Sequence, residues 1–248
     1  MLTLYRPHIL SDRYRLIDYI YTALHRAHLD GTPLIQPLWF KYPKDVNTFS
    51  IDTQFFYGSS ILVSPVLDEN STTARYYLPD DIFYDFKTLA PVRGAGQEVT
   101  VENVGFEEIP VHIRGGVVLP VRVRGGMTTT EVRKEDFEFV VAPGLGRGGV
   151  AEGELYVDDG VLIDQPRTTE VRMRYQGGKL RVEGQFGYEA GAGVASVRFL
   201  GVKEAPRGVK VDGKAVKGGA VAYDKTTEVL SATIGIPLRK GFTVEYYA

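Results

Sequence analysis

The sequence predicts a mainly β protein that opens with a short α/β piece and continues as antiparallel β-sandwich structure. Three observations support this prediction. One amphipathic helix pattern occurs, over residues 13–30. From about Ser60 onward, short runs rich in Val, Ile, Tyr and Phe are separated by Gly, Pro, Asp and Asn. No second convincing helix pattern interrupts these runs, so most of the chain is expected to form sheets.

The helix pattern near the start is bounded at both ends. Ser11 or Asp12 can cap its first turn, Gly31 supplies the left-handed residue that commonly ends a helix, and Pro33 blocks any continuation. Most charged residues lie off the apolar stripe, which consists of Leu16, Ile17, Ile20, Tyr21, Leu24 and Ala27. We therefore expect one amphipathic helix over this range.

The segment after the helix, residues 34–40, reads LIQPLWF and lies between Pro33 and Pro43. A short and nearly continuous apolar run suits a strand that is covered on both faces, as in a parallel sheet. One helix and one such strand do not make a domain. We therefore expect the chain to begin in the middle of a fold.

Two features of the β-rich part make local predictions. In the segment 209–216, Asp212 and Gly213 can take the positive φ angles of a type I′ turn between alternating strands, which predicts a hairpin. The glycine-rich segment GLGRGG, residues 144–149, is too short to separate modules and is expected to join two strands.

Composition and charge do not favour nucleic acid or a membrane as a partner. The 248 residues are 44% hydrophobic and 24% charged, with a net charge of −2 and a pI near 6.1. Nucleic acid and anionic membranes need clustered Lys and Arg, so neither is favoured. No apolar run is long enough to span a membrane, and Met1–Leu10 lacks the apolar core of a signal peptide. There is no cysteine, so disulfides give no information on the compartment.

One sequon, Asn70-Ser71-Thr72, occurs in a turn-like setting and favours N-glycosylation and secretion, although such tripeptides also arise by chance.

Other apparent binding or catalytic motifs are better explained as turns, bends and surface residues of the fold. Gly144, Gly146 and Gly149 satisfy G-x-G-x-x-G, but no helix follows to receive a pyrophosphate. His25 and His28 are three residues apart without a third ligand in a recognised spacing, so we predict no metal site. The Arg-Gly-Gly triplets are interpreted as bends in the strands rather than as RNA-binding elements. A hydrolase triad that includes His112 is not expected, because the sequence contains no G-x-S-x-G nucleophile elbow.

Adjacent carboxylates occur at Asp80-Asp81, Glu107-Glu108 and Asp158-Asp159. Glycosidic hydrolysis with retention needs two carboxylates about 5 Å apart. Neighbouring residues on a strand point to opposite faces, and Asp158-Asp159-Gly160 is typical of a turn. No catalytic residue is therefore predicted within this chain, and its substrate-binding residues are unknown.

Successive blocks of the sequence resemble glycoside hydrolase family 31, and most closely the fungal α-glucosidases. The blocks cover most of residues 13–160, in the order RYRLIDYIYTALHRAHLDGTPLIQPLWFKYP, DVNTFSIDTQFFYGSSILVSPVL, ARYYLPDDIFYDF, EIPVHIRGGVVLP, TTTEVRKEDFEFVVAPG and GELYVDDG. The chain departs from the family where Gln36-Pro37-Leu38-Trp39 replaces the common Arg-Pro-Leu-Phe, which puts any role of that arginine in doubt.

The resemblance implies an architecture and a function. Residues 1–59 would be the C-terminal elements of a catalytic (β/α)8 barrel, residues 60–123 a proximal β-sandwich and residues 124–248 a distal one. The chain would be the C-terminal, structural part of a secreted, retaining α-glucosidase without metal or cofactor. A larger chain or an upstream segment would supply the catalytic aspartates and bind most of the α-glucoside substrate.

A rival hypothesis of another class is a non-catalytic carbohydrate-binding or interaction module made of the two sandwiches. Aromatic residues such as Tyr76, Tyr77, Phe83 and Tyr84 could stack on sugars if one face exposed them. Residues of this kind on alternating strands are more often buried in a core.

Overall fold

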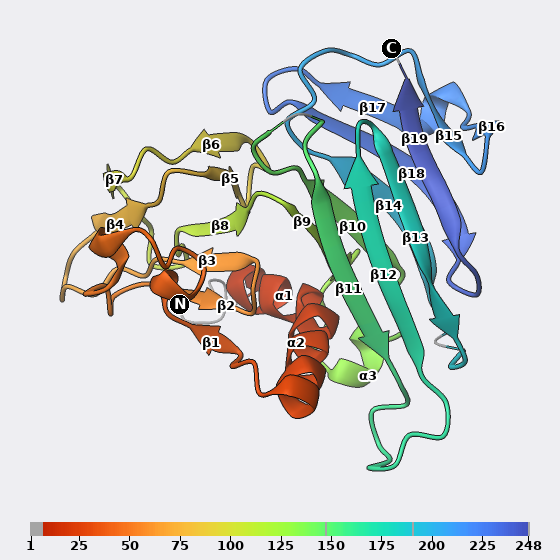
Figure 1. Cartoon of the computed structure of the whole chain (residues 1–248), viewed down its shortest axis with the longest axis horizontal. Helices are drawn as coiled ribbons and strands as arrows, with labels where there is room; N and C mark the ends of the chain where they lie inside the picture. The colour runs from red at the N-terminus through yellow and green to blue at the C-terminus, as the bar shows by residue number, and fades with distance from the viewer. Residues whose placement is uncertain (1–6, 147, 190, 248) are drawn as a thin grey trace.

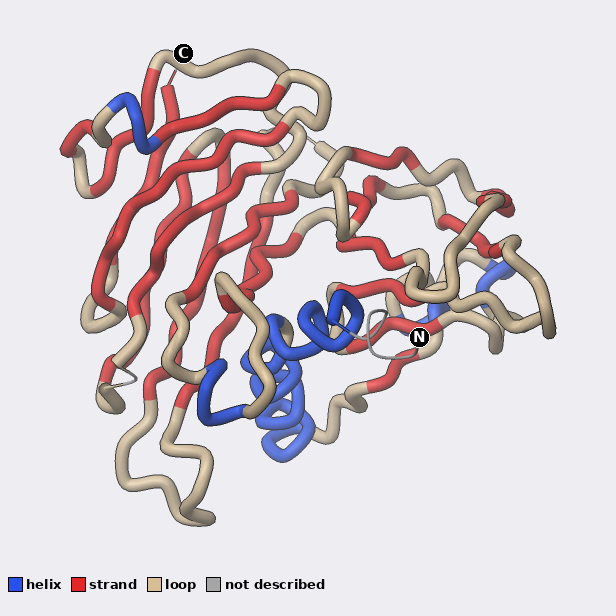
Figure 2. The backbone as a smooth tube through the Cα atoms, turned by 180° about the vertical axis from the view of Figure 1, so that it is seen from behind, coloured by secondary structure: helices blue, strands red, loops and turns tan. Residues whose placement is uncertain are grey.

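The computed structural model describes residues 7–146, 148–189 and 191–247, which form three β-sheets and several short helices. Figure 1 shows a large, strongly curved sheet beside a smaller layered region, with the helical segment 7–30 between them. Seen from behind in Figure 2, the helices again lie against the large sheet. The mainly β prediction is confirmed.

The structure has two helices where the sequence predicts one. α1 (Pro7–Arg15) and α2 (Ile17–Asp30) are separated at Leu16, and α1 begins before Ser11 and Asp12, so the prediction that these residues cap the start was wrong. Proline is well suited to the first helical position, which explains the earlier start. The end was predicted correctly: Gly31 has φ 78° and its N–H donates to the Ala27 carbonyl at 3.0 Å.

The strand expected over residues 34–40 is largely absent. Only β1 (Ile35–Gln36) is extended, and it pairs antiparallel with β2 at the edge of a sheet. Leu38–Phe40 is instead a 3₁₀ helix, η1, in which the Phe40 N–H donates to the Pro37 carbonyl. Because Pro37 has no N–H to donate, it interrupts the ladder at this point. A second 3₁₀ turn, η2 (Val46–Thr48), follows.

The smaller region consists of two antiparallel sheets packed face to face. The first has the order β1-β2-β3-β8-β5-β6 and the second is the pair β4-β7. Alternate residues of the first sheet face opposite cores: Leu62 and Phe83 pack toward β4-β7, while Ile61 and Tyr84 pack toward the large sheet. The strands are β2 (Phe55–Tyr57), β3 (Ile61–Val63), β4 (Ala74–Leu78), β5 (Ile82–Asp85), β6 (Pro91–Arg93), β7 (Gln97–Val101) and β8 (Val111–Arg114).

The large sheet has the strand order β16-β15-β19-β13-β12-β11-β9-β10-β14-β18-β17. All its pairs are antiparallel except β9-β11 and β10-β14. The strands are β9 (Val117–Arg122), β10 (Phe137–Ala142), β11 (Ala151–Val157), β12 (Thr169–Gln176), β13 (Lys179–Phe186), β14 (Gly193–Phe199), β15 (Gly208–Val211), β16 (Lys214–Ala215), β17 (Val221–Asp224), β18 (Val229–Pro237) and β19 (Phe242–Tyr247), and the short helices are α3 (Thr129–Val132) and η3 (Gly218–Ala220).

The large sheet bends round its own core. Phe139 on β10 and Phe242 on β19 stack at 6.5 Å with an interplanar angle of 4°, although several strands separate them in the sheet order. The bend therefore gives a sandwich-like arrangement. β9 and β10 are buried on both faces, since Val118 and Phe139 belong to this core while Leu119 and Val140 face the helices and the smaller region.

The local predictions for the β-rich part are confirmed. Val211 pairs with Lys214, and Asp212 and Gly213 have φ angles of 47° and 79°, as a type I′ hairpin requires. The segment 144–149 joins β10 to β11, with Arg147 outside the described residues.

Paired strands cross both predicted domain borders. β2 pairs with β3 on either side of 59/60, and β9 pairs with β10 on either side of 123/124. The three-part division of the chain stays a prediction.

Candidate functional site

A buried ion pair fixes α2 to the large sheet. Arg122, at the end of β9, donates from Nε to Oδ2 of Asp18 at 2.6 Å and from Nη2 to Oδ1 at 2.8 Å. The side chains are 1% and 8% exposed. The guanidinium lies 3.8 Å from the Phe137 ring centroid and also donates to the carbonyls of Arg133 and Glu135. With its donors satisfied in this way, the arginine can stay charged away from water.

The same helix makes three further contacts with β11 and the residue that follows it. Tyr21 donates to Oδ2 of Asp158 at 2.8 Å, and the Tyr156 N–H donates to Thr22 Oγ1 at 3.0 Å. The His25 ring stacks on Tyr156 at 3.6 Å. Burial, reinforced by the hydrogen bond to Asp158, raises the pKa of Tyr21 to about 12. α2 therefore docks on the sheet through these polar and aromatic contacts as well as through Tyr19, which packs in the core with β9 and β10.

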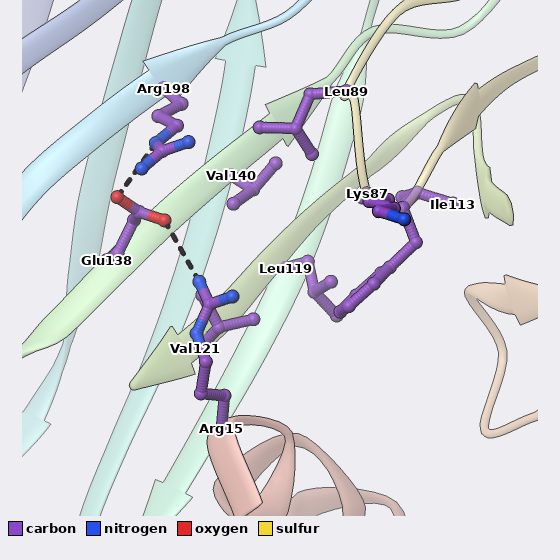
Figure 3. Close-up of a pocket in the computed structure, with 10 residues that line it drawn as sticks. Arg15, Lys87, Leu89, Ile113, Leu119, Val121, Glu138, Val140 and Arg198 are labelled. Carbon is purple, nitrogen blue, oxygen red and sulfur yellow. Dashed lines mark hydrogen bonds and ion pairs between the residues drawn. The ribbon is translucent and has the colours of Figure 1, made fainter. Parts of the chain in front are cut away.

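Figure 3 shows a cavity beside this junction, between α1, the β5-β6 loop and the large sheet. Glu138, nearly buried on β10, lies between two arginines: Arg198 donates to it at 2.9 Å, and Arg15 lies at 3.4 Å. Ser196 donates to the same carboxylate at 2.9 Å. The remaining walls are largely apolar and include Leu89 and Val140.

The cavity is too small for a sugar-binding site. Its volume is about 80 Å³, whereas ligand pockets usually measure about 300–1,000 Å³. Glu138 is paired with two cations, so the arrangement contains no carboxylate available for acid or base chemistry. We interpret the cavity as a packing defect at a junction of elements.

His112 on β8 is a polar residue in the core between the two sheets of the smaller region. It is 4% exposed, with its ring 5.4 Å from Tyr76 and 6.4 Å from Phe83. Its Nδ1 has no hydrogen-bond partner among the described residues. Burial lowers the pKa of His112, with Asp85 opposing that effect. His112 is therefore a core residue whose surroundings favour the uncharged form of the imidazole.

The adjacent carboxylates serve different partners. Asp81 accepts a hydrogen bond from Tyr42 at 3.0 Å, while Asp80 pairs with Arg93. Asp158 is buried and Asp159 is half-buried, and Asp159 Oδ1 accepts from two backbone N–H groups of the following turn.

The histidine pair of α2 takes no metal-like arrangement. His25 stacks on an aromatic ring and His28 is exposed. Within the described ranges, no three His, Cys, Asp or Glu side chains form a group that could hold a metal ion. In the same ranges no helix is both long and apolar enough to cross a membrane.

The aromatic residues named for a sugar platform are buried. Tyr76, Tyr77, Phe83 and Tyr84 are 5%, 8%, 0% and 3% exposed, and they belong to the two cores of the smaller region. They cannot form the exposed stacking face that the rival hypothesis requires of them.

The glycosylation candidate Asn70 lies in an exposed turn between β3 and β4, with φ 58°.

Exposed apolar side chains are frequent over residues 24–49, here named the apolar segment. It runs from the second half of α2 through β1 and η1 to just past η2. Its large exposed apolar residues are Leu24, Leu29, Ile35, Trp39, Phe40, Val46 and Phe49. The stripe expected to be the buried side of the helix thus leaves Leu24 about half exposed, while Asp18 and Thr22 are buried. A concentration of this kind is typical of a surface that another protein segment covers.

Sequence reasoning missed the pair Asp18–Arg122. A signal was available, because Arg122 is the one charged residue in the apolar run VVLPVRV, residues 117–123. A charge in such a run is buried only if it is paired. The partner could not be identified, since 104 positions separate it from Asp18.

Comparison with known proteins places these features in context. Residues 31–119 match the model of the glycosyl hydrolase family 31 C-terminal domain. A probable alpha/beta-glucosidase, agdC, of Neosartorya fischeri is 50% identical over 230 residues, which are 92% of this chain and 25% of that protein. The alpha-glucosidase of Schizosaccharomyces pombe is 36% identical over 225 residues, or 89% of this chain and 23% of that protein. The chain thus spans about a quarter of the length of these curated relatives.

Solved structures agree with this similarity. The glucosidase II alpha subunit in its DNJ-bound form matches with a TM-score of 0.81 and 27% identity, over 94% of this chain and 28% of that one. An ER glucosidase II heterodimeric complex, of a catalytic subunit and the binding domain of a regulatory subunit, matches with a TM-score of 0.79, 26% identity and the same coverage.

Proposed function

Because the chain belongs to glycoside hydrolase family 31 and carries that family's C-terminal domain, we propose that it is the C-terminal, structural part of an α-glucosidase. The whole enzyme would hydrolyse terminal α-linked glucose from malto-oligosaccharides with retention. Its catalytic aspartates would come from another chain or from an upstream segment that also holds most of a (β/α)8 barrel. Residues 1–59 would contribute the last elements of that barrel.

The observation that carries the proposal is the exposure of the apolar segment. Trp39 and Phe40 are each 43% exposed, and their rings lie edge to face at 4.4 Å. Complete burial of a fully exposed side chain of this kind is worth about 1.5–3 kcal/mol, and the seven of the apolar segment still have 43–70% of their surface in water, so covering each would gain roughly half of that. A covering catalytic part gives this surface a use, and the relatives are about four times as long as the matched region.

The role of this chain would be to support that covering part. The bidentate pair Asp18–Arg122 and the bond from Tyr21 to Asp158 hold α2 firmly on the large sheet. These bonds thereby hold α2, and with it Leu24 at the start of the apolar segment, in a fixed position. A rigid frame lowers the entropic cost of docking the catalytic part.

The catalytic chemistry would lie outside this chain. Retention requires a nucleophilic carboxylate and an acid/base carboxylate about 5 Å apart. Asp18, Glu138 and Asp158 are the buried carboxylates of the described chain, and each accepts hydrogen bonds from neighbouring side chains. These three carboxylates therefore have a structural role in the fold.

Secretion, glycosylation at Asn70 and assembly as a heterodimer complete the proposal. Asn70 is exposed in a turn, a setting that an oligosaccharyltransferase can reach. Native protein should lose mass on treatment with peptide N-glycosidase F, and an Asn70→Gln variant should not. An unchanged mass of the native protein would contradict the glycosylation.

Reconstitution tests the proposed function. The chain is mixed with the part of Neosartorya fischeri agdC that lies outside the matched quarter, and hydrolysis of maltose is measured. We expect no activity from this chain alone and activity from a one-to-one complex. A catalytic part that is fully active and stable without this chain would refute the proposal.

A further inference from the structure

The loop between β11 and β12 carries three consecutive apolar side chains at its tip. Val161, Leu162 and Ile163 are 83%, 53% and 99% exposed. Figures 1 and 2 both show this loop projecting beyond the helices, at the end of the molecule where α3 lies. Neither the catalytic reaction nor the internal packing of the chain accounts for them.

Internal bonds hold the loop in one shape. Asp159 Oδ1 accepts from the N–H groups of Val161 and Leu162 at 2.8 and 3.0 Å, and from Gln165 Nε2 at 2.9 Å. Asp158 Oδ1 accepts from the Gly160 N–H at 2.7 Å, and Gly160 takes a φ of 68° that favours glycine. The apolar tip is thus held by its own turn, which limits the entropy lost on binding.

The base of the loop is joined to the helix that begins the apolar segment. Asp158, the first residue after β11, accepts a hydrogen bond from the Tyr21 hydroxyl at 2.8 Å. Leu24, the first exposed apolar residue of the segment, lies one turn further along α2. A partner that covers the outer side of α2 therefore also lies close to the loop.

We propose that the tip 161–163 is a second docking element for the catalytic part, inserted in an apolar depression of that part. This inference rests on the proposed function and adds to it a defined contact. Of the two carboxylates that flank the tip, Asp164 is exposed and Asp159 is half-buried, with Arg133 lying beside the neighbouring Gly160. Hydrogen bonds, that from the Leu162 N–H foremost, lower the pKa of Asp159 and keep it charged.

The flanking charges favour this occupant over a lipid surface. Anionic membranes attract clustered Lys and Arg, and next to the tip in the sequence lies the exposed carboxylate of Asp164 instead of such a cluster. The bond between Tyr21 and Asp158 also ties the loop to the surface that faces the proposed partner, which a lone membrane-inserting loop would not need.

The test measures binding to the catalytic part of agdC described above, by surface plasmon resonance. The double variant Val161→Ser, Ile163→Ser should dissociate at least about tenfold faster than the wild type, since two apolar side chains lose their burial. The control Phe106→Ser removes an equally exposed ring elsewhere and should bind like the wild type. Circular dichroism should show all three proteins folded alike.

The outcomes separate the two proposals. If the wild type binds and the double variant binds within twofold of it, the docking loop is refuted while the proposed function stands. If the wild type itself does not bind, assembly from two separate chains fails as part of the proposed function, and the docking loop fails with it. Binding to phosphatidylcholine and phosphatidylserine vesicles, or self-association, that the double variant abolishes would also overturn the inference, because the tip would then serve a membrane or a second copy.

Discussion

Replacing Asp18 by Asn should destabilise the protein strongly, although the two side chains have nearly the same shape. The substitution removes a charge that receives two hydrogen bonds from Arg122, at 2.6 and 2.8 Å. It also turns one acceptor oxygen into an amino group that faces the donors of the guanidinium. The arginine, 1% exposed, would then be a buried charge without its counter-ion.

The size of the effect follows from that burial. Breaking a buried pair by removing one partner costs about 3–5 kcal/mol. The cation–π contact with Phe137 at 3.8 Å and the bonds to two carbonyls remain, so a value near the lower end of this range is expected. With an m-value of about 3 kcal/mol/M, the urea midpoint should fall by about 1 M or more.

Urea unfolding followed by circular dichroism measures this shift against a matched control. Arg174 and Glu152 form an exposed pair at 3.6 Å, with side chains 66% and 65% exposed, and Arg174→Gln should cost about 0–1 kcal/mol. A second variant, Asp18→Leu with Arg122→Met, removes both charges and should recover much of the loss. A midpoint for Asp18→Asn that equals that of the exposed control would refute the reasoning.

Three further predictions concern other parts of the fold. Because burial lowers the pKa of His112 below its ordinary 6.5, unfolding takes up a proton as the pH falls below 6.5. Stability should therefore be complete above pH 6.5, fall below it and level off under the lowered pKa; His112→Phe should flatten this part of the pH profile, and an unchanged slope would contradict it. Gly213→Ala should cost about 1 kcal/mol in thermal unfolding because φ is 79°, whereas Gly218→Ala, with open space around it and no positive φ, should cost less; equal costs would argue against the type I′ turn. Glu138→Gln should lower stability by about 2 kcal/mol, since two arginines lose a shared counter-ion; calorimetry showing no change would contradict this pairing.

The parts of the fold that depend on local geometry could be predicted from the sequence. The Asp212-Gly213 hairpin and the helix end at Gly31 each need a residue that tolerates positive φ, and such residues are visible in the sequence. The helix pattern also predicted α2, although it did not predict the direction in which the helix docks. That direction depends on Asp18 meeting Arg122, a contact between distant residues that periodicity cannot reveal.

The wrong prediction for residues 34–40 has a physical cause. The apolar composition of a segment does not show which other element covers its side chains, or whether any does. The apolar composition of residues 34–40 predicts a buried strand, yet Pro37 ends the ladder and Trp39 is 43% exposed. The burial of Tyr84, by contrast, agrees with the expectation that aromatic residues on alternating strands are more often core residues. In both cases the neighbours of the residue decided its exposure.

The mass of the native protein tests the central claim most directly. Native protein is purified from its source under gentle conditions, and its mass is measured by light scattering and, after denaturation, by mass spectrometry. The account predicts a particle well above 27.5 kDa in which these 248 residues accompany a larger catalytic polypeptide or continue one. A homogeneous, stable monomer of 27.5 kDa that stays soluble without a partner would contradict it.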